Sequence, residues 1–381
     1  MTKIQYPKTK LSKQFLHFVY IFFTYALPKP GAKTGSFVGV NTKYIMMKNI
    51  PGLLFIFILS TSCGPNQTNA PQDNGRAGYS ESQLKEADTS KVPMSMVRNI
   101  KQARNGDILI ASYLGVFRYN GTSFTNISSE ISSPSFWDVL EDRKGNLWFA
   151  SKDSGVYHLP AGEISFQHFT TKDGLASNMA LHIYEDRDGN IWFGASRYDG
   201  KSFRNFTTKD GFPSNNIRLL LEDKTGKLWF GAHGENMFVY DGKTFTVLKN
   251  KDGKAFNNVW SIIEDRKGNI WFGADGLWRY DGSTFTKVSQ RGVYAIIEDK
   301  KGNIWTTGGV KLYGDVWALS RYDAKSLYDK TPTVTEIMSQ GPALLGLMEA
   351  NDGSIWFGSG SGVYRYDGNT ITDFKSKEDQ Q

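Results

Sequence analysis

The chain has 381 residues, a formal net charge of +7 and a single cysteine. One cysteine excludes a disulfide-stabilised scaffold and a zinc site made of four thiolates, whereas 39% hydrophobic residues are enough for a packed core. The positive charge comes from residues 1–45, which contain seven lysines and no acidic residue, so residues 46–381 are neutral overall. A neutral body gives no electrostatic footprint for nucleic acid, and we expect no such partner.

Residues 1–62 have the composition of a targeting leader. Met46-Met47-Lys48 precedes an apolar run of about ten residues, which is too short to span a bilayer, and small residues then lead to Cys63. This order resembles a bacterial lipoprotein signal, in which that cysteine becomes the lipidated first residue. Ser60 occupies the place where the common motif has leucine. An ordinary secretory signal is the alternative.

From this resemblance we expect a lipid anchor at Cys63 and an envelope location, periplasmic or at the outer membrane. Translation is expected to start at Met46 or Met47, which would make residues 1–45 an extension of the gene model. Residues 63–91 are polar and rich in Pro, Gly and Asn, which is typical of a flexible tether.

One phrase, approximately Glu-Asp-x-x-Gly-Asn-Ile-Trp-Phe-Gly, recurs at intervals that average about 41 residues. Its copies are Gln102–Ala111 (with Leu109 in place of Trp), Glu141–Ala150, Glu185–Gly194, Glu222–Gly231, Glu264–Gly273, Glu298–Thr307 and Glu349–Gly358. Seven copies of this length fill residues 92–381.

Each repeat contains four short segments rich in β-branched and aromatic residues, which predicts four strands, A to D. In the fifth repeat these are Val259–Ile263, Asn269–Gly273, Gly276–Tyr280 and Thr284–Val288. Asp-x-x-Gly between A and B favours a type I turn, and Asp-Gly between C and D favours a short hairpin. Four antiparallel strands in seven repeats predict an all-β, seven-bladed β-propeller, with the recurrent Trp and Phe packed between blades.

The repeats resemble those of the two-component regulator propeller family. Asp173–Asn178 followed by Ile183–Gly194 gives that family's order of D-G-L-x-S-N, an apolar strand and E-D-x-x-G-N-x-W-x-G. The resemblance implies a periplasmic sensing propeller. The sequence shows no kinase after the last repeat, so we expect no signalling output from this chain alone. Streptogramin lyases, which share a G-x-I-W-F phrase, are a more distant resemblance.

Strand direction divides the loops between two faces of the ring. The A–B and C–D turns share one face and are expected to be nearly identical in every blade. The B–C and D–A connections share the other, which we name the mouth face, and vary in length. Ala195–Tyr198 is a short connection and Gly308–Ser320 a long one, predicting a notch and a lip where a ligand would bind.

Candidate ligand-binding residues belong to the mouth face. Five of them stand four places before the first residue of the phrase, which is Gln102 in the first repeat and Glu in the others. The other four follow the B strands. The set is Arg98, Trp137, Lys152, Arg197, Arg218, His233, Trp260, Asp275 and Tyr294. Exposed aromatic and Arg side chains would suit a sugar, aromatic or peptide ligand, and capping of the blades is the alternative.

Catalytic and metal-binding signatures are weak. The sequence contains no nucleophile elbow, phosphate loop or HExxH, and the paired acids of the Asp-x-x-Gly turns are explained by turn geometry. We expect no metal and no cofactor. His182 and His233 are the only plausible pair for a lyase.

Three functions remain open. The first is a non-enzymatic, monomeric binding propeller whose partner is an envelope protein, peptide or glycan. The others are a lyase acting at the mouth and a purely structural envelope protein. The ring would close either within its last blade or through a strand from residues 78–92 pairing with a blade edge.

Overall fold

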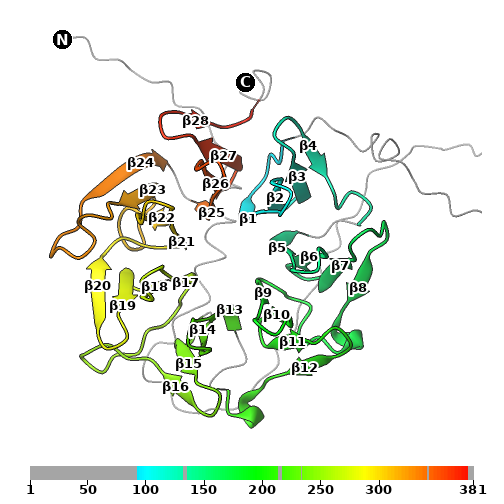
Figure 1. Cartoon of the computed structure of the whole chain (residues 1–381), viewed down its shortest axis with the longest axis horizontal. Coiled ribbons are helices and arrows are strands. Elements are labelled where there is room, and N and C mark those ends of the chain that lie inside the picture. Colours follow the sequence, from blue (N-terminus) through cyan, green and yellow to red (C-terminus); the bar gives the residue numbers. More distant parts are fainter. Residues whose placement is uncertain (1–91, 132–134, 213–216, 233, 341–342, 376–381) are drawn as a thin grey trace, which may run out of the picture. The chain divides into compact units, whose positions relative to one another are not determined.

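The computed structural model describes residues 92–131, 135–212, 217–232, 234–340 and 343–375. In this part of the chain 28 strands form seven four-stranded antiparallel sheets, which follow one another around a ring (Figure 1). Each sheet is one blade, and its strands are consecutive in sequence, with strand A nearest the centre. The prediction of a seven-bladed β-propeller is confirmed.

The first four blades occupy the segment from Val97 to Val247. Blade 1 contains β1 (Val97–Gln102), β2 (Ile108–Ser112), β3 (Gly115–Tyr119) and β4 (Phe124–Asn126). Blade 2 contains β5 (Phe136–Glu141), β6 (Leu147–Ser151), β7 (Val156–Leu159) and β8 (Gln167–Phe169). Blade 3 contains β9 (Ile183–Glu185), β10 (Ile191–Phe193), β11 (Ser196–Tyr198) and β12 (Phe203–Asn205). Blade 4 contains β13 (Ile217–Glu222), β14 (Leu228–Ala232), β15 (Phe238–Tyr240) and β16 (Phe245–Val247).

The last three blades complete the ring. Blade 5 contains β17 (Ile262–Glu264), β18 (Ile270–Gly273), β19 (Leu277–Tyr280) and β20 (Phe285–Ser289). Blade 6 contains β21 (Ala295–Glu298), β22 (Ile304–Gly309), β23 (Trp317–Tyr322) and β24 (Val334–Gln340). Blade 7 contains β25 (Leu344–Glu349), β26 (Ile355–Ser359), β27 (Gly362–Tyr366) and β28 (Ile371–Thr372). Two 3₁₀ turns, Thr171–Asp173 and Thr208–Asp210, precede blades 3 and 4.

The core lies between blades, because successive residues of a strand point to opposite faces of its sheet. Trp148 packs against Ile183 and Ile191 of blade 3, whereas the next residue, Phe149, packs against Leu109 of blade 1. The same alternation places the other tryptophans of the phrase in the following gap. The predicted burial of the recurrent Trp and Phe is confirmed.

The Asp of the A–B turn holds the tryptophan that follows six residues later. Its carboxylate accepts a hydrogen bond from the indole Nε1–H at 2.7–2.9 Å and also from backbone N–H groups of the turn. The pairs are Asp142–Trp148, Asp186–Trp192, Asp223–Trp229, Asp265–Trp271 and Asp299–Trp305. Blade 1 lacks both members, with Ala103 and Leu109 in their places.

A belt of ion pairs joins each blade to the next on the A–B turn face. The basic residue after the turn Asp, or after Ala103 in blade 1, donates its backbone N–H to the Glu of the following blade at 2.7–2.8 Å. In five of the six pairs the side chains also form an ion pair: Arg104–Glu141, Arg143–Glu185, Arg187–Glu222, Lys224–Glu264 and Arg266–Glu298. In the sixth pair, Lys300–Glu349, the Lys300 side chain donates to the Ala350 and Asn351 carbonyls instead.

The ring closes between blades 7 and 1 without exchanging a strand. Asn351 and Gln102 take the places of the basic residue and the acid, and the Asn351 N–H donates to Gln102 Oε1 at 2.8 Å. A methyl group at Gly346 would lie 2.8 Å from the Asn99 Cα, so the two blades meet in backbone contact. Blade 7 is complete from its own segment, and residues 78–91 lie outside the described part of the chain.

Candidate functional site

A β-bulge interrupts strand A in blades 1, 2 and 4, and in blades 1 and 2 it redirects one side chain away from the packing between blades. The pairing of β1 with β2 shifts between Val97 and Asn99, so Arg98 is the extra residue. The pairing of β5 with β6 shifts in the same way around Trp137, and that of β13 with β14 around Arg218. A bulge redirects the side chain that it carries, and these bulges lie at the mouth-face end of strand A.

Arg98 is the centre of a cluster at the mouth. Its guanidinium carbon lies 4.0 Å from the centroid of the Trp137 ring, in blade 2. Its two Nη atoms donate to the hydroxyls of Tyr113 (2.8 Å, blade 1) and Tyr294 (3.2 Å, blade 6). Arg98 therefore links three blades and spans the position of blade 7, which lies between blades 6 and 1 in the ring.

Aromatic side chains extend the cluster through blades 5 and 6. The Tyr294 ring lies 5.2 Å from that of Trp260 and 6.1 Å from that of Trp317 between centroids. We name Arg98, Tyr113, Trp137, Trp260, Tyr294 and Trp317 the mouth cluster. Four of these six residues were predicted, and the structure brings the four together.

The charge of Arg98 is retained despite burial. Burial alone would lower its pKa, but the electrostatic contribution of the Tyr294 and Tyr113 hydroxyls and their hydrogen bonds outweigh it, and the pKa lies above its usual value. The mouth cluster therefore holds a permanent positive charge among aromatic rings.

The predicted notch and lip are both present. Only Gly194 and Ala195 separate β10 from β11 in blade 3, whereas β22 and β23 of blade 6 extend into a hairpin that turns at Lys311–Gly314. Trp317 lies at the base of this lip. Tyr313 lies at its tip, is 85% exposed and has a φ of 60°, in the left-handed region that tyrosine rarely adopts.

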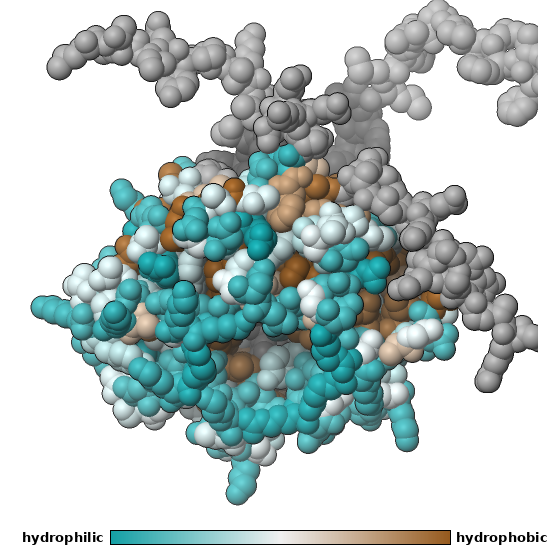
Figure 2. Space-filling model, turned by 45° about the horizontal axis from the view of Figure 1, so that its top comes forward, coloured by the Kyte–Doolittle hydropathy of each residue, from teal (hydrophilic) through white to brown (hydrophobic). Residues whose placement is uncertain are grey.

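Most of the exposed large hydrophobic residues belong to segments of the mouth face. Most of the surface visible in Figure 2 is hydrophilic, with hydrophobic residues in small groups. Of the eight large hydrophobic residues that are exposed in the described part of the chain, five belong to mouth-face segments: Met94, Leu114, Met179, Tyr313 and Val316. They come from blade 1, blade 6 and the connection between blades 2 and 3.

Arg197 does not join the mouth cluster. Arg197 lies within β11, where its guanidinium carbon is 5.9 Å from the Trp192 ring; Arg279 and Arg321 stack on Trp271 and Trp305 in the same way. Arg197 therefore repeats a packing position. The prediction that it lies past the B strand, on the variable face, is wrong because the blade 3 connection is so short.

Two further predicted residues have partners close to their own strands. The Asp275 carboxylate accepts from Trp278 Nε1 at 2.8 Å and pairs with Lys287 at 3.2 Å. The Lys152 N–H donates to the Ser135 carbonyl at the end of β6. The side chain of Arg218 and the whole of His233 lie outside the described residues, as does Cys63.

A polar network centres on Asp138, one residue after Trp137 in strand A of blade 2. Asp138 is fully buried and binds Asn99 (2.7 Å), Lys101 (3.3 Å) and His182 Nδ1 (3.0 Å), and its carboxylate accepts from the Ile183 N–H (2.9 Å). Burial alone would raise the pKa of Asp138, but Lys101 and His182 lower it below its usual value. The network therefore ties blades 1, 2 and 3 together. His182 has a structural partner, and its pairing with His233 stays a prediction.

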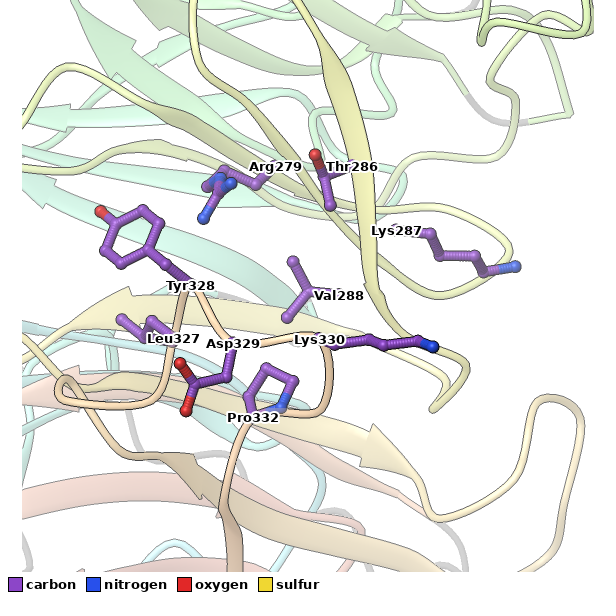
Figure 3. A pocket seen from close by; sticks show the side chains of 9 residues that line it. All are labelled: Arg279, Thr286, Lys287, Val288, Leu327, Tyr328, Asp329, Lys330 and Pro332. Atoms are coloured by element: carbon purple, nitrogen blue, oxygen red, sulfur yellow. The ribbon is translucent and has the colours of Figure 1, made fainter.

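One cavity lies away from the mouth. It has a volume of about 250 Å³ and is formed by blade 5 and the C–D connection of blade 6, Asp323–Thr333. Tyr328 and Arg279 line one side, with the guanidinium carbon of Arg279 4.4 Å from the centroid of the Tyr328 ring. Lys287 and Lys330 line the other side (Figure 3). The expectation that all C–D turns are nearly identical is wrong, because blade 6 has an 11-residue connection there.

Neither a metal centre nor a membrane span can be built from the part of the chain that the structure describes. Within these residues there is no group of three or more His, Cys, Asp or Glu side chains placed to hold a metal ion. The same residues include no helix that is long and apolar enough to cross a membrane.

The fold and site together define a propeller with one unsymmetrical face, and sequence comparison assigns its repeats. Residues 130–153, 174–197, 211–234 and 253–276 match the model of the two component regulator propeller. Each of these segments contains strands A and B of one blade. Blades 2 to 5 therefore carry two component regulator propeller repeats, as the resemblance implied. No curated protein sequence matches the chain.

Solved structures share the fold. The extracellular domain of the hybrid two component system BT3049 from B. thetaiotaomicron aligns with a TM-score of 0.61 at 22% identity, over 74% of this chain. Streptogramin B lyase aligns at 0.56 and 13% identity, over 73% of this chain and 95% of the lyase. PorZ, a surface component of the type-IX secretion system of Porphyromonas gingivalis, aligns at 0.52 and 15% identity, over 71% of this chain and 46% of PorZ.

The aligned region covers different shares of these three structures. This chain spans 40% of the BT3049 extracellular domain. At such identities each likeness shows the fold alone, and the activity of the lyase does not pass to this chain.

Proposed function

We propose that the chain is a non-enzymatic recognition propeller of the bacterial envelope, which binds a ligand or a partner protein at its mouth face. The observation that supports this proposal is the mouth cluster. Its six residues come from blades 1, 2, 5 and 6, and none of them belongs to the repeated phrase. A fold built by repetition does not need an arginine that contacts Trp137, Tyr113 and Tyr294 at one place only.

The chemistry of the cluster suits recognition. Aromatic side chains and arginine provide most of the binding energy at protein interfaces, and aromatic faces also stack on sugars and planar groups. The exposed residues around the cluster, such as Leu114 and Tyr313, would enlarge the contact with a partner protein. A glycan, a peptide and an envelope protein are therefore the candidate partners, and the chain would act as a monomer.

Capture from envelope extract tests the proposal. The full chain is immobilised beside the Trp137→Ala/Trp260→Ala double variant, and the retained components are identified and purified. Tyr328→Ala is the matched control, because it also removes a partly exposed aromatic ring but lies at the other cavity.

We expect a component that the wild type and the control retain and the double variant loses, with at least about a tenfold weaker affinity when the purified component is titrated. Equal retention by a folded double variant would show that the mouth is not the binding site.

Attachment to the envelope is proposed from the leader. Cys63 follows an apolar run and small residues, and a lipid on that cysteine would hold the propeller at a membrane through the segment 64–91. Labelled palmitate should enter the wild type in a bacterial host and should not enter Cys63→Ser. Label in both proteins, or in neither, would contradict the anchor.

A further inference from the structure

Arg98 differs from the basic residues of the ion-pair belt in having no acidic partner. Each belt residue contacts a Glu of the next blade. Within the described residues no carboxylate lies within ion-pair distance of Arg98, and its partners are the neutral hydroxyls of Tyr113 and Tyr294 and the faces of aromatic rings. A guanidinium removed from water usually has a carboxylate beside it, because desolvation of an unpaired charge is costly.

Two buried hydrogen-bond donors in the cluster also lack an acceptor. Arg98 Nε and Trp137 Nε1 are inaccessible to solvent and have no hydrogen-bond partner in the described part of the chain. The core tryptophans of blades 2 to 6 donate to an Asp, and Trp278 donates to Asp275. Buried donors are rarely left unpaired, and an unpaired one costs about 1–3 kcal/mol. The C-strand arginines also have an unpaired Nε, but they repeat from blade to blade and stack in the core.

We infer that the mouth cluster binds a carboxylate presented by its ligand, with Arg98 as the residue that pairs with it. This inference rests on the proposed recognition function and adds the chemical class of the ligand. The ligand oxygens would take the Nε and Nη2 edge of the guanidinium, which is the fork that matches a carboxylate. The Tyr113 hydroxyl, at 2.8 Å from Nη2, would be displaced, and the same movement has to expose Nε, which is covered in this structure.

The rest of the cluster restricts what the carboxylate belongs to. Trp260, Tyr294 and Trp317 offer aromatic faces beside Arg98, on which a sugar ring or an apolar side chain can stack. A uronic acid and the C-terminus of a peptide both join a carboxylate to such a group.

Binding of matched acid and neutral probes by the full chain tests the inference. The sugar probes are oligogalacturonate and its methyl ester, and the peptide probes are an aliphatic peptide with a free C-terminus and its amide. Affinity is measured by calorimetry and by tryptophan fluorescence for the wild type, Arg98→Gln, Arg98→Lys, Tyr113→Phe and Trp260→Ala. Thermal unfolding confirms that each variant is folded.

We expect at least one acid probe to bind the wild type about tenfold or more tightly than its neutral counterpart. Arg98→Gln should remove this preference and Arg98→Lys should retain part of it. Tyr113→Phe should bind the acid at least as tightly as the wild type, because no hydroxyl has to be displaced. The pair of probes that binds identifies the source of the carboxylate.

Two outcomes would overturn the inference. One is that neither acid probe binds better than its neutral counterpart. The other is that Arg98→Gln keeps the preference. If Trp260→Ala then weakens acid and neutral probes alike, the mouth is still a recognition site and only the carboxylate assignment is wrong. The envelope capture experiment decides the recognition function separately.

Discussion

The two faces of the propeller use the same residue types in opposite ways. On the A–B turn face every basic residue of the belt meets a Glu, and the tryptophans of blades 2 to 6 meet an Asp. On the mouth face Arg98 contacts tyrosines and Trp137 lacks an acceptor. The turn face is explained by folding alone, whereas the mouth face leaves groups that a second molecule can satisfy. The predictions below test this difference.

Acidification should have the largest effect, because it acts on several blades at once. Burial alone would raise the pKa of Asp142, but hydrogen bonds from Trp148 and Asn146 outweigh it and hold the pKa below its usual value; Asp223 is lowered in the same way by Thr225 and Trp229. Such a carboxylate stabilises the fold fully above its unfolded pKa of about 3.9, and this contribution is lost as pH falls through the folded pKa.

Urea unfolding at a series of pH values measures this loss. The free energy of unfolding should be nearly constant from pH 7 to about 5 and fall steeply below about pH 4. Asp142→Asn should show a shallower fall than the wild type. A free energy that does not change between pH 5 and pH 3 would contradict the role assigned to the turn carboxylates.

Removal of the Asp138 carboxylate should have the largest effect of any single substitution. Asp138→Ala leaves Lys101, His182 and the Ile183 N–H without their common partner, and the expected loss of unfolding free energy is about 4 kcal/mol. Asp138→Asn keeps the shape and one acceptor oxygen, so its loss should be smaller. Urea unfolding followed by far-ultraviolet circular dichroism distinguishes the two; equal stability of wild type and Asp138→Ala would show that the network does not hold blades 1 to 3 together.

A matched pair of Trp→Phe substitutions compares the two faces directly. Trp148→Phe takes a donor away from the Asp142 carboxylate and should lower the unfolding free energy by about 2 kcal/mol. Trp137→Phe removes a donor that has no acceptor, so stability should be unchanged or slightly higher, whereas ligand binding should weaken. A similar loss of stability in both variants would mean that Trp137 is structural.

Substitutions at the junction between blades 7 and 1 should have the smallest effect on the free energy of unfolding. Gln102→Glu combined with Asn351→Arg would add a seventh pair to the belt, and the expected gain is at most about 0.5 kcal/mol because the belt pairs are partly exposed. The gain should disappear in high salt and be absent from Gln102→Glu alone. A destabilised double variant would indicate that the amide pair is required at this junction.

The fold could be predicted because the residues of the repeated phrase determine both the A–B turn and the core position that follows it. Asp and Gly set the turn, and Trp follows at a fixed distance, so one copy predicts the next. The mouth residues in strand A could be predicted for the same reason, since their position is counted from the acid. That Arg98 and Trp137 stand in bulges was not predicted. Each bulge places two apolar residues three apart in the same core cluster, Val97 with Ile100 and Phe136 with Val139, and this spacing alone does not distinguish a bulge from other irregular backbone.

Tyr113 was missed because it belongs to a B–C connection, and Trp317 because it begins a C strand directly after one. These connections differ in length between blades, so no position in one blade predicts its counterpart in another. The exposed Tyr313 was missed for the same reason. The long C–D connection of blade 6 was missed because Tyr322-Asp323 begins as the short turns of other blades do. Local turn chemistry therefore predicts how a connection starts but not how far it extends.

The closure described above gives all seven junctions between blades the same kind of backbone hydrogen bond. Each sheet is formed by one continuous segment, and the last junction repeats the backbone hydrogen bond of the other six with a neutral acceptor. The ring consequently has no privileged first blade. A circular permutant opened at another D–A connection would keep every sheet in one continuous segment, and the same property lets whole blades be duplicated or exchanged during evolution while the mouth diversifies.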